Sequence, residues 1–170
     1  NGRPFLIVAG IGFDAEVVHR TRGLIKRLLR QKAFVAVGLK LALQAARLPE
    51  FRYQVDEETP LRANYFVLSN IQCYAGKSLF TTDAQAPEFQ GFAMDARSAL
   101  PLFRFAWQTR KENVFNRIGR ISNAASYPHI QRLRILSSQP MAVQIDGEPY
   151  IPDNPRKLEF RTLPRSQTFL

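Results

Sequence analysis

The chain has 170 residues, which is the size of one ordinary domain and enough to bury a single hydrophobic core. An apolar fraction of 45% and a charged fraction of 22% are typical of a soluble folded domain and exclude a disordered chain. No apolar run is long enough to span a bilayer. The formal net charge of +10 favours anionic partners, namely phosphates, nucleic acid or an acidic lipid surface.

Cys73 is the only cysteine, so an internal disulfide is excluded, and His19 and His129 lie too far apart in sequence to suggest a metal cluster. A reducing, cytoplasmic setting is the simplest expectation. The chain opens NGRPFLIVAG, with neither an initiator methionine nor a signal peptide, and an apolar strand begins almost at once. We therefore expect a domain that belongs to a longer protein.

The first expected elements are a strand around Phe5–Ala9 and a helix that follows it. Apolar residues recur at helical spacing through GIGFDAEVVHRTRGLIKRLLRQ, with basic residues on the other side. Asp14 stands where an N-cap is expected, so its carboxylate would accept the amides of the first turn. A second helical run covers about Phe34–Leu48 and ends at Pro49.

The remainder of the chain is expected to consist mostly of short strands, in FRYQVD, NYFVLSN, LRIL, MAVQID and KLEFRTL. One more helix is expected over about Leu100–Arg120, with Pro101 in its first turn. Strands and helices do not alternate regularly, which disfavours a doubly wound nucleotide fold. The predicted fold class is mainly β with helices (α+β). We expect one domain over residues 1–170, a β-sandwich with a helical insertion after its first strand.

Two segments imitate nucleotide-binding motifs. AGKS, Ala75–Ser78, would need a glycine five positions before Gly76 to be a phosphate loop, and that position is Ile71. AGIG, Ala9–Gly12, lacks the third glycine of a dinucleotide fingerprint. We therefore expect an ordinary loop at the first segment and a close-packed strand-to-helix turn at the second.

The basic side of the first helix is a candidate anionic-surface site, formed by Arg20, Arg22, Lys26, Arg27 and Arg30. Most such helix faces are simply solvated. The functional alternative is that the guanidinium groups pair with phosphates of lipid headgroups or of nucleic acid. Single-stranded nucleic acid would also require exposed aromatic residues, which this helix lacks. The pattern disfavours nucleic acid without excluding it.

The segment VQIDGEPY, residues 143–150, runs from a strand into Asp146, Gly147 and Glu148. Asp-Gly between two strands is among the commonest hairpin turns, because primed turns need residues that tolerate positive φ. Such a turn can also hold a carboxylate at a strand end, where it is better positioned than on a loop. Glu148 could then accept a proton from a substrate hydroxyl that attacks a phosphate. Both interpretations stay open on these residues alone.

AGIGFDAEVV near the start, SNIQCYAGKSL in the middle and QIDGEP about 130 residues after the first segment together resemble the diacylglycerol kinase family of lipid kinases. The resemblance is to the second, β-rich domain and covers nearly the whole chain in order. It implies an N-terminal nucleotide-binding domain with a GGDGT motif, which this sequence does not contain. The parent protein would use ATP and Mg²⁺ to phosphorylate a lipid such as diacylglycerol, and this domain alone would be inactive.

Carried over position by position, the resemblance makes Glu148 the catalytic proton acceptor. It also assigns five cleft residues, which complete the turn or form the strand-to-helix corner: Asp146, Gly147, Gly10, Gly12 and Asp14. The implied partners are the lipid substrate, the protein's own nucleotide-binding domain and an anionic membrane surface. A cytoplasmic enzyme of phospholipid metabolism, peripheral to the membrane, is expected. An apolar face left by the missing domain would allow a homo-oligomer.

One segment departs from the family pattern. In TTDAQAPEFQGFAMDA, Phe89 and Gln90 precede Gly91, where the family has acidic residues that help to hold a structural magnesium. Neither side chain replaces a carboxylate as a ligand for a hard cation. We expect no magnesium of the family type here, with Asp83 and Asp95 as surface or turn residues.

The rival function is a non-catalytic module that binds anionic ligands, in which residues 146–148 form only a turn. The sequence does not fix which lipid the family resemblance would imply, since sphingoid and glycerol backbones are both open. A GGDGT segment in the preceding part of the parent chain would favour the kinase.

Overall fold

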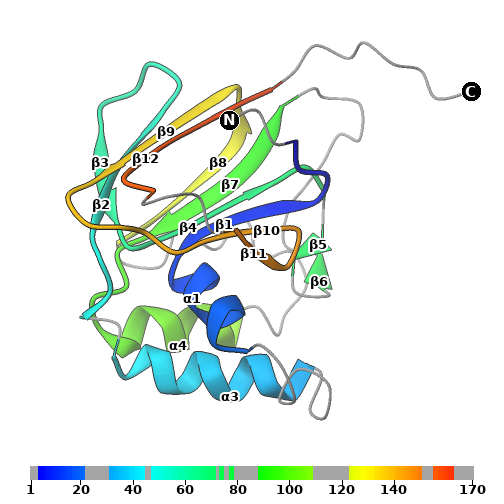
Figure 1. Ribbon diagram of the computed structural model, residues 1–170, viewed down its shortest axis with the longest axis vertical. Coiled ribbons are helices and arrows are strands. Elements are labelled where there is room, and N and C mark those ends of the chain that lie inside the picture. The colour runs from blue at the N-terminus through cyan, green and yellow to red at the C-terminus, as the bar shows by residue number, and fades with distance from the viewer. Residues whose placement is uncertain are drawn as a thin grey trace, which may run out of the picture.

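The computed structural model describes residues 4–21, 31–44, 47–71, 73–74, 77–78, 88–108, 123–150 and 155–162. In chain order its elements are β1 (Val8–Gly12), α1 (Phe13–Arg20), α3 (Gln31–Ala42), β2 (Phe51–Val55), β3 (Leu61–Ala63), β4 (Tyr65–Ser69), β5 (Cys73–Tyr74), β6 (Lys77–Ser78), β7 (Phe89–Met94), α4 (Ala99–Gln108), β8 (Ala124–Ile130), β9 (Arg132–Ser137), β10 (Val143–Ile145), β11 (Glu148–Tyr150) and β12 (Lys157–Arg161). Figure 1 shows the strands gathered above a group of helices.

The strands form two larger antiparallel sheets and one small ribbon. The larger sheet has six strands in the order β11-β10-β1-β4-β7-β8, and the smaller sheet has four in the order β12-β9-β2-β3. The ribbon pairs β5 with β6. β11 is therefore an edge strand of the larger sheet, and its middle residue, Pro149, has no amide hydrogen to donate.

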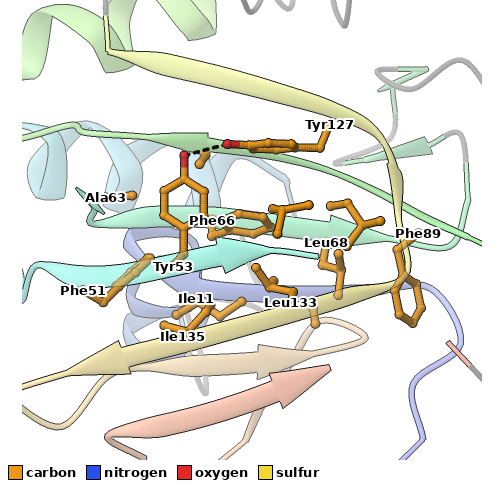
Figure 2. Close-up of a cluster of buried hydrophobic side chains, with 14 of the residues drawn as sticks. Ile11, Phe51, Tyr53, Ala63, Phe66, Leu68, Phe89, Tyr127, Leu133 and Ile135 are labelled. Atoms are coloured by element: carbon orange, nitrogen blue, oxygen red, sulfur yellow. Dashed lines mark hydrogen bonds between the residues drawn. The ribbon is translucent and has the colours of Figure 1, made fainter. Parts of the chain in front are cut away.

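The two sheets pack face to face around an apolar core, which Figure 2 shows in close-up. The smaller sheet contributes Phe51, Leu133 and Ile135, and the larger sheet contributes residues such as Ile11 and Phe66, all of them buried. Side chains alternate along a strand, so β2 buries every second residue and turns the others outward. Burial of this apolar surface is the main stabilising contribution to the sandwich.

One polar pair lies within this core. The hydroxyl groups of Tyr53 on β2 and Tyr127 on β8 are 3.0 Å apart and share a hydrogen bond, drawn as a dashed line in Figure 2. Burial raises the pKa of both phenols, so the neutral form is favoured. The pair joins the two sheets without leaving a buried hydroxyl unsatisfied.

The helices cover the opposite face of the larger sheet and form a third layer. Phe13, Leu41, Leu102 and Phe105 from the helices pack against β4 and β7. Both of these strands are buried at every position, because sheet packs on one side of them and helix on the other. This double burial explains the dense apolar run NYFVLSN, which lacks the alternation of β2. None of the described helices has the length and apolar character needed to span a bilayer.

The predicted fold class is confirmed, since the chain is mainly β and its first helices follow the first strand. The boundaries differ from those expected. β1 begins only at Val8, because the preceding Leu6 and Ile7 are exposed and their amides bond to a side chain. α1 ends at Arg20, and residues 22–30 lie outside the described ranges. The third predicted helix corresponds to α4, and residues 109–122 also lie outside those ranges.

The N-cap predicted at Asp14 is wrong. The N-cap is Gly12, with φ 74° and ψ −121°, and Phe13 and Asp14 are the first two residues of the helix. Gly12 adopts a backbone conformation that a residue with a Cβ avoids, which lets the chain turn abruptly from strand to helix. The Phe13 amide then donates to the Asn64 carbonyl at 2.9 Å. The Asp14 side chain turns instead toward β10, and this contact is central to the candidate site.

Candidate functional site

The hairpin between β10 and β11 is the turn that the sequence predicts. Asp146 and Gly147 form its two-residue loop with φ values of 54° and 81°, the positive values of a primed turn. The strands pair outward from Ile145 opposite Glu148. Glu148 is therefore the first residue of β11, and it is exposed. The hairpin prediction is confirmed, and the candidate proton acceptor lies at a strand end.

Asp146 attaches the N-terminal segment to this hairpin. Its carboxylate accepts the backbone N–H groups of Leu6 at 3.0 Å, Ile7 at 2.8 Å and Val8 at 3.0 Å. Its own N–H donates to the Val8 carbonyl at 2.8 Å. Hydrogen bonds to an ionised carboxylate are among the stronger ones in proteins, so the entry to β1 is held beside the turn. These contacts give Asp146 a structural task, and its place in a substrate cleft stays a prediction.

A buried hydrogen-bonded chain connects the hairpin with the strand-to-helix corner. Gln144 on β10 is 2% exposed. Its Nε2 donates to Asp14 Oδ2 at 2.8 Å, and its Oε1 accepts the Gly147 N–H at 2.9 Å. Because the NH₂ group and the carbonyl oxygen of the same amide side chain are both hydrogen-bonded, the position of the turn is fixed relative to that of the corner. Residues 130 positions apart in sequence are thus brought together.

The two glycines of the corner make this approach sterically feasible. A Cβ at Gly10 would overlap Asp14 Oδ2 and lie 2.7 Å from Gln144 Nε2. A Cβ at Gly12 would overlap the backbone carbonyl of Asn64. The AGIG segment is therefore a close-packed strand-to-helix corner, as predicted, and Gly10 is the residue that leaves room for the buried carboxylate.

α1 is fixed against β10 near both of its ends. Asp14 in its first turn bonds to Gln144, and His19 in its last turn donates from Nε2 to the Val143 carbonyl at 2.9 Å. The next residue, Arg20, is about half exposed and donates to Glu16 at 3.0 Å. The other members of the predicted anionic-surface site, namely Arg22, Lys26, Arg27 and Arg30, lie outside the described ranges.

The segment predicted to have lost a metal site is described only in part. Phe89 and Gln90 are buried in β7, and Asp95 just beyond it accepts two hydrogen bonds from Arg97 Nε at 2.8 and 3.0 Å. Asp83 lies outside the described ranges. Within those ranges no three His, Cys, Asp or Glu side chains gather as metal ligands. The expectation that this segment holds no magnesium of the family type therefore stays a prediction.

A hollow of about 260 Å³ lies away from the hairpin. It is lined by residues of β2, β3, β7 and β8, including Tyr53, Arg62 and Asp95. Met94, which lines this hollow, pairs with Tyr65, and Tyr65 pairs with Gly12 at the C-terminal end of β1. The hairpin lies at the other end of β1, where Asp146 bonds to Val8. The hollow and the candidate carboxylate are thus separate features.

Solved structures share this arrangement of sheets and helices. A candidate diacylglycerol kinase from Bacillus anthracis str. Sterne matches with a TM-score of 0.62 and 15% identity over 95% of this chain. The chain shares the fold of about half of this diacylglycerol kinase structure. A structure of diacylglycerol kinases from the same organism matches with a TM-score of 0.53 and 11% identity over 88% of the chain. A third structure, again a candidate diacylglycerol kinase, has a TM-score of 0.58 and 14% identity over 95% of the chain.

The chain spans about half the length of these diacylglycerol kinase structures, namely 52%, 44% and 52% of them. No protein-family model and no curated protein sequence matches it. At such low identity the likeness establishes the fold, and it confirms at that level the resemblance seen in AGIGFDAEVV and QIDGEP.

Sequence reasoning missed Gln144, although it lies inside the quoted VQIDGEPY segment. In a strand alternation a glutamine between Val143 and Ile145 is expected to face solvent. Here β10 is buried at all three of its positions, and Gln144 faces a carboxylate of α1. A signal was available in principle, because Asp14 also sits among apolar residues and a buried acid needs a donor.

Proposed function

We propose that this chain is the C-terminal, lipid-side domain of a diacylglycerol-kinase-like lipid kinase, in which Glu148 is the proton acceptor. The shared fold supports the family, and one observation supports the residue. The chain of hydrogen bonds from Asp14 through Gln144 to the Gly147 amide holds the turn directly before Glu148 in a fixed position. A carboxylate on such a strand end is well placed to act on a bound substrate.

In the proposed reaction the oxygen of a lipid hydroxyl bonds to the γ-phosphorus of ATP while the bond to the departing ADP oxygen breaks. The hydroxyl proton passes to the Glu148 carboxylate. Phosphoryl transfer depends mainly on positioning and on charge stabilisation, so a fixed acceptor is a useful contribution from a domain without a nucleotide motif. By the family resemblance, we assign ATP and Mg²⁺ binding to the nucleotide-binding domain of the parent protein.

The exposure of Glu148 supports this division of labour. A proton acceptor that serves a substrate held between two domains must lie at the surface of its own domain, and Glu148 does. Asp146, Gly10, Gly12 and Asp14 would then act indirectly, by fixing the turn and the corner. We infer a peripheral membrane enzyme of the cytoplasm, since its lipid substrate resides in a bilayer.

The test is Glu148→Gln in the full-length protein, because glutamine keeps the size of the side chain and removes its basicity. Lipid phosphorylation should fall by about 10²- to 10⁴-fold, the usual contribution of a general base. Glu57→Gln, at an exposed turn position with a side chain 87% exposed, is the matched control and should retain activity. Both variants should unfold at the urea concentration of the unmodified protein. Unchanged turnover in Glu148→Gln would remove Glu148 from this role.

The alternative is an anion-binding module without catalysis, which the net charge of +10 favours. A GGDGT segment upstream in the parent protein would support the kinase, and its absence would support the binding module.

A further inference from the structure

The outer face of the smaller sheet is strongly basic. Strand register and burial place nine side chains on it, and their inward neighbours belong to the sandwich core. Six of the nine are cations and one is a carboxylate: Arg62 on β3, Arg52 and Gln54 on β2, Arg132, Arg134 and Leu136 on β9, and Lys157, Glu159 and Arg161 on β12. We call this set the basic sheet face. Figure 1 places its strands on the side of the larger sheet opposite the helices.

Two cross-strand pairs on the basic sheet face join like charges. Arg52 lies directly opposite Arg62 in the β2–β3 pairing, and Arg132 lies directly opposite Arg161 in the β9–β12 pairing. Like charges in this position destabilise a sheet. The apolar core does not require them, since these side chains point outward. An anionic partner that neutralised the face would relieve the repulsion.

The carboxylates of the chain neutralise the face only in part. One oxygen of Glu159 is 2.8 Å from an Arg161 nitrogen and 3.6 Å from Nε of both Arg132 and Arg134. Each guanidinium carries five N–H donors, so a single shared oxygen leaves most of them directed elsewhere. Glu50 pairs with Arg62 at 2.9 Å at the rim.

Two cations of the face are still less compensated. Arg52 and Lys157 are exposed, and neither makes an ion pair with any residue that the structure describes. Leu136 lies between them in the register, opposite both, and is 53% exposed. The middle of the face therefore combines two uncompensated charges with an exposed apolar side chain.

We propose that the basic sheet face docks on a bilayer of acidic lipids. Arginine side chains pair readily with the phosphates of lipid headgroups, and the exposed Leu136 can contact the apolar boundary beneath them. The nine outward positions include no aromatic side chain on which a base could stack, which disfavours single-stranded nucleic acid. This face is distinct from the basic segment that begins at Arg20.

The test uses the chain itself with vesicles of phosphatidylcholine, with or without phosphatidylglycerol, in a sedimentation assay. A basic residue near an acidic leaflet strengthens binding about fivefold, so Arg52→Gln combined with Lys157→Gln should weaken binding to acidic vesicles about 25-fold. The matched control is Lys40→Gln combined with Arg104→Gln, which removes the same charge from exposed positions of α3 and α4. The control should bind within about twofold of the unmodified chain, since distant exposed charges are screened.

Four results would overturn the proposal. Equal binding of the unmodified chain to neutral and acidic vesicles would remove the role of charge. Equal losses in the two double variants would assign binding to net charge, and a loss confined to Lys26→Gln with Arg27→Gln would assign it to the other basic segment. Binding of an oligonucleotide but not of acidic vesicles would make the face a nucleic-acid site. Circular dichroism melts establish that each variant folds, and the assay does not involve Glu148, so the two proposals fail independently.

Discussion

The strand-to-helix corner with its hairpin and the basic sheet face use polar residues in opposite ways. At the corner, Asp14, Gln144 and the Gly147 amide satisfy one another in the interior. On the basic sheet face, Arg52 lies opposite Arg62 and the charges are only partly paired within the chain. Polar groups that are satisfied internally fix a geometry, whereas groups left toward solvent can meet a partner. The first region is therefore suited to positioning the candidate carboxylate, and the second to attracting an anionic partner.

The largest expected effect is at the corner, in Gly12→Ala. Gly12 has φ 74°, and a Cβ there would overlap the Asn64 carbonyl, so the free energy of unfolding should fall by about 4 kcal/mol. Gly147→Ala is the matched control, since Gly147 has φ 81° with no atom within 4 Å of the added Cβ. It should cost about 1 kcal/mol. Urea denaturation measures both, and equal losses would contradict close packing as the cause.

A smaller loss is expected when the connection between corner and hairpin is cut. Gln144→Leu removes a donor from the buried carboxylate of Asp14, which should cost about 3 kcal/mol of unfolding free energy. Asp14→Asn keeps an acceptor oxygen for Gln144 and should cost about 1 kcal/mol. Hydrogen exchange of the Gly147 amide should accelerate in Gln144→Leu only. If Asp14→Asn is equally destabilising, the hydrogen bond is not the main contribution.

The smallest effect is expected on the basic sheet face, in Glu159→Gln. A hydrogen bond from Arg161 lowers the pKa of Glu159, with further lowering by Arg134 and Arg132. Its stabilising contribution is therefore present above the ordinary glutamate pKa and is lost as pH falls through the lowered value. The variant should unfold at slightly lower temperature than the unmodified chain at neutral pH and low salt, and the two should converge in acid or at high salt. A difference that persists in strong acid would contradict this account.

The elements with local signals were predictable from the sequence. The alternation of β2 and the Asp-Gly turn each specify their own conformation through side-chain periodicity and positive φ. The start of β1 was not predictable in this way. The run FLIVA is uniformly apolar, yet Leu6 and Ile7 are excluded from the strand and bond to Asp146, some 140 residues later.

The two regions also differed in how much the sequence disclosed. The resemblance placed Asp14 and the hairpin in one site, but the contact between them depends on Gln144, which looks like an ordinary outward residue until α1 covers β10. The basic sheet face has no local signal, because its cations are single residues scattered over four strands and only the register collects them. A basic run such as Arg20–Arg30 can be recognised in one short stretch of sequence, whereas a basic face formed by strands that are distant in sequence cannot.

The proline that follows Glu148 has a consequence for association between copies of the chain. Ile145 and Glu148 form the hydrogen-bonded pair that closes this two-residue hairpin, and Gln144 and Pro149 form the next pair. In that next pair the backbone N–H and C=O positions point away from the partner strand. A second strand approaching the rim of the six-stranded sheet would find no amide hydrogen there. The edge strand β11, which carries the candidate carboxylate, is therefore a poor partner for β-strand pairing with a second copy of the chain.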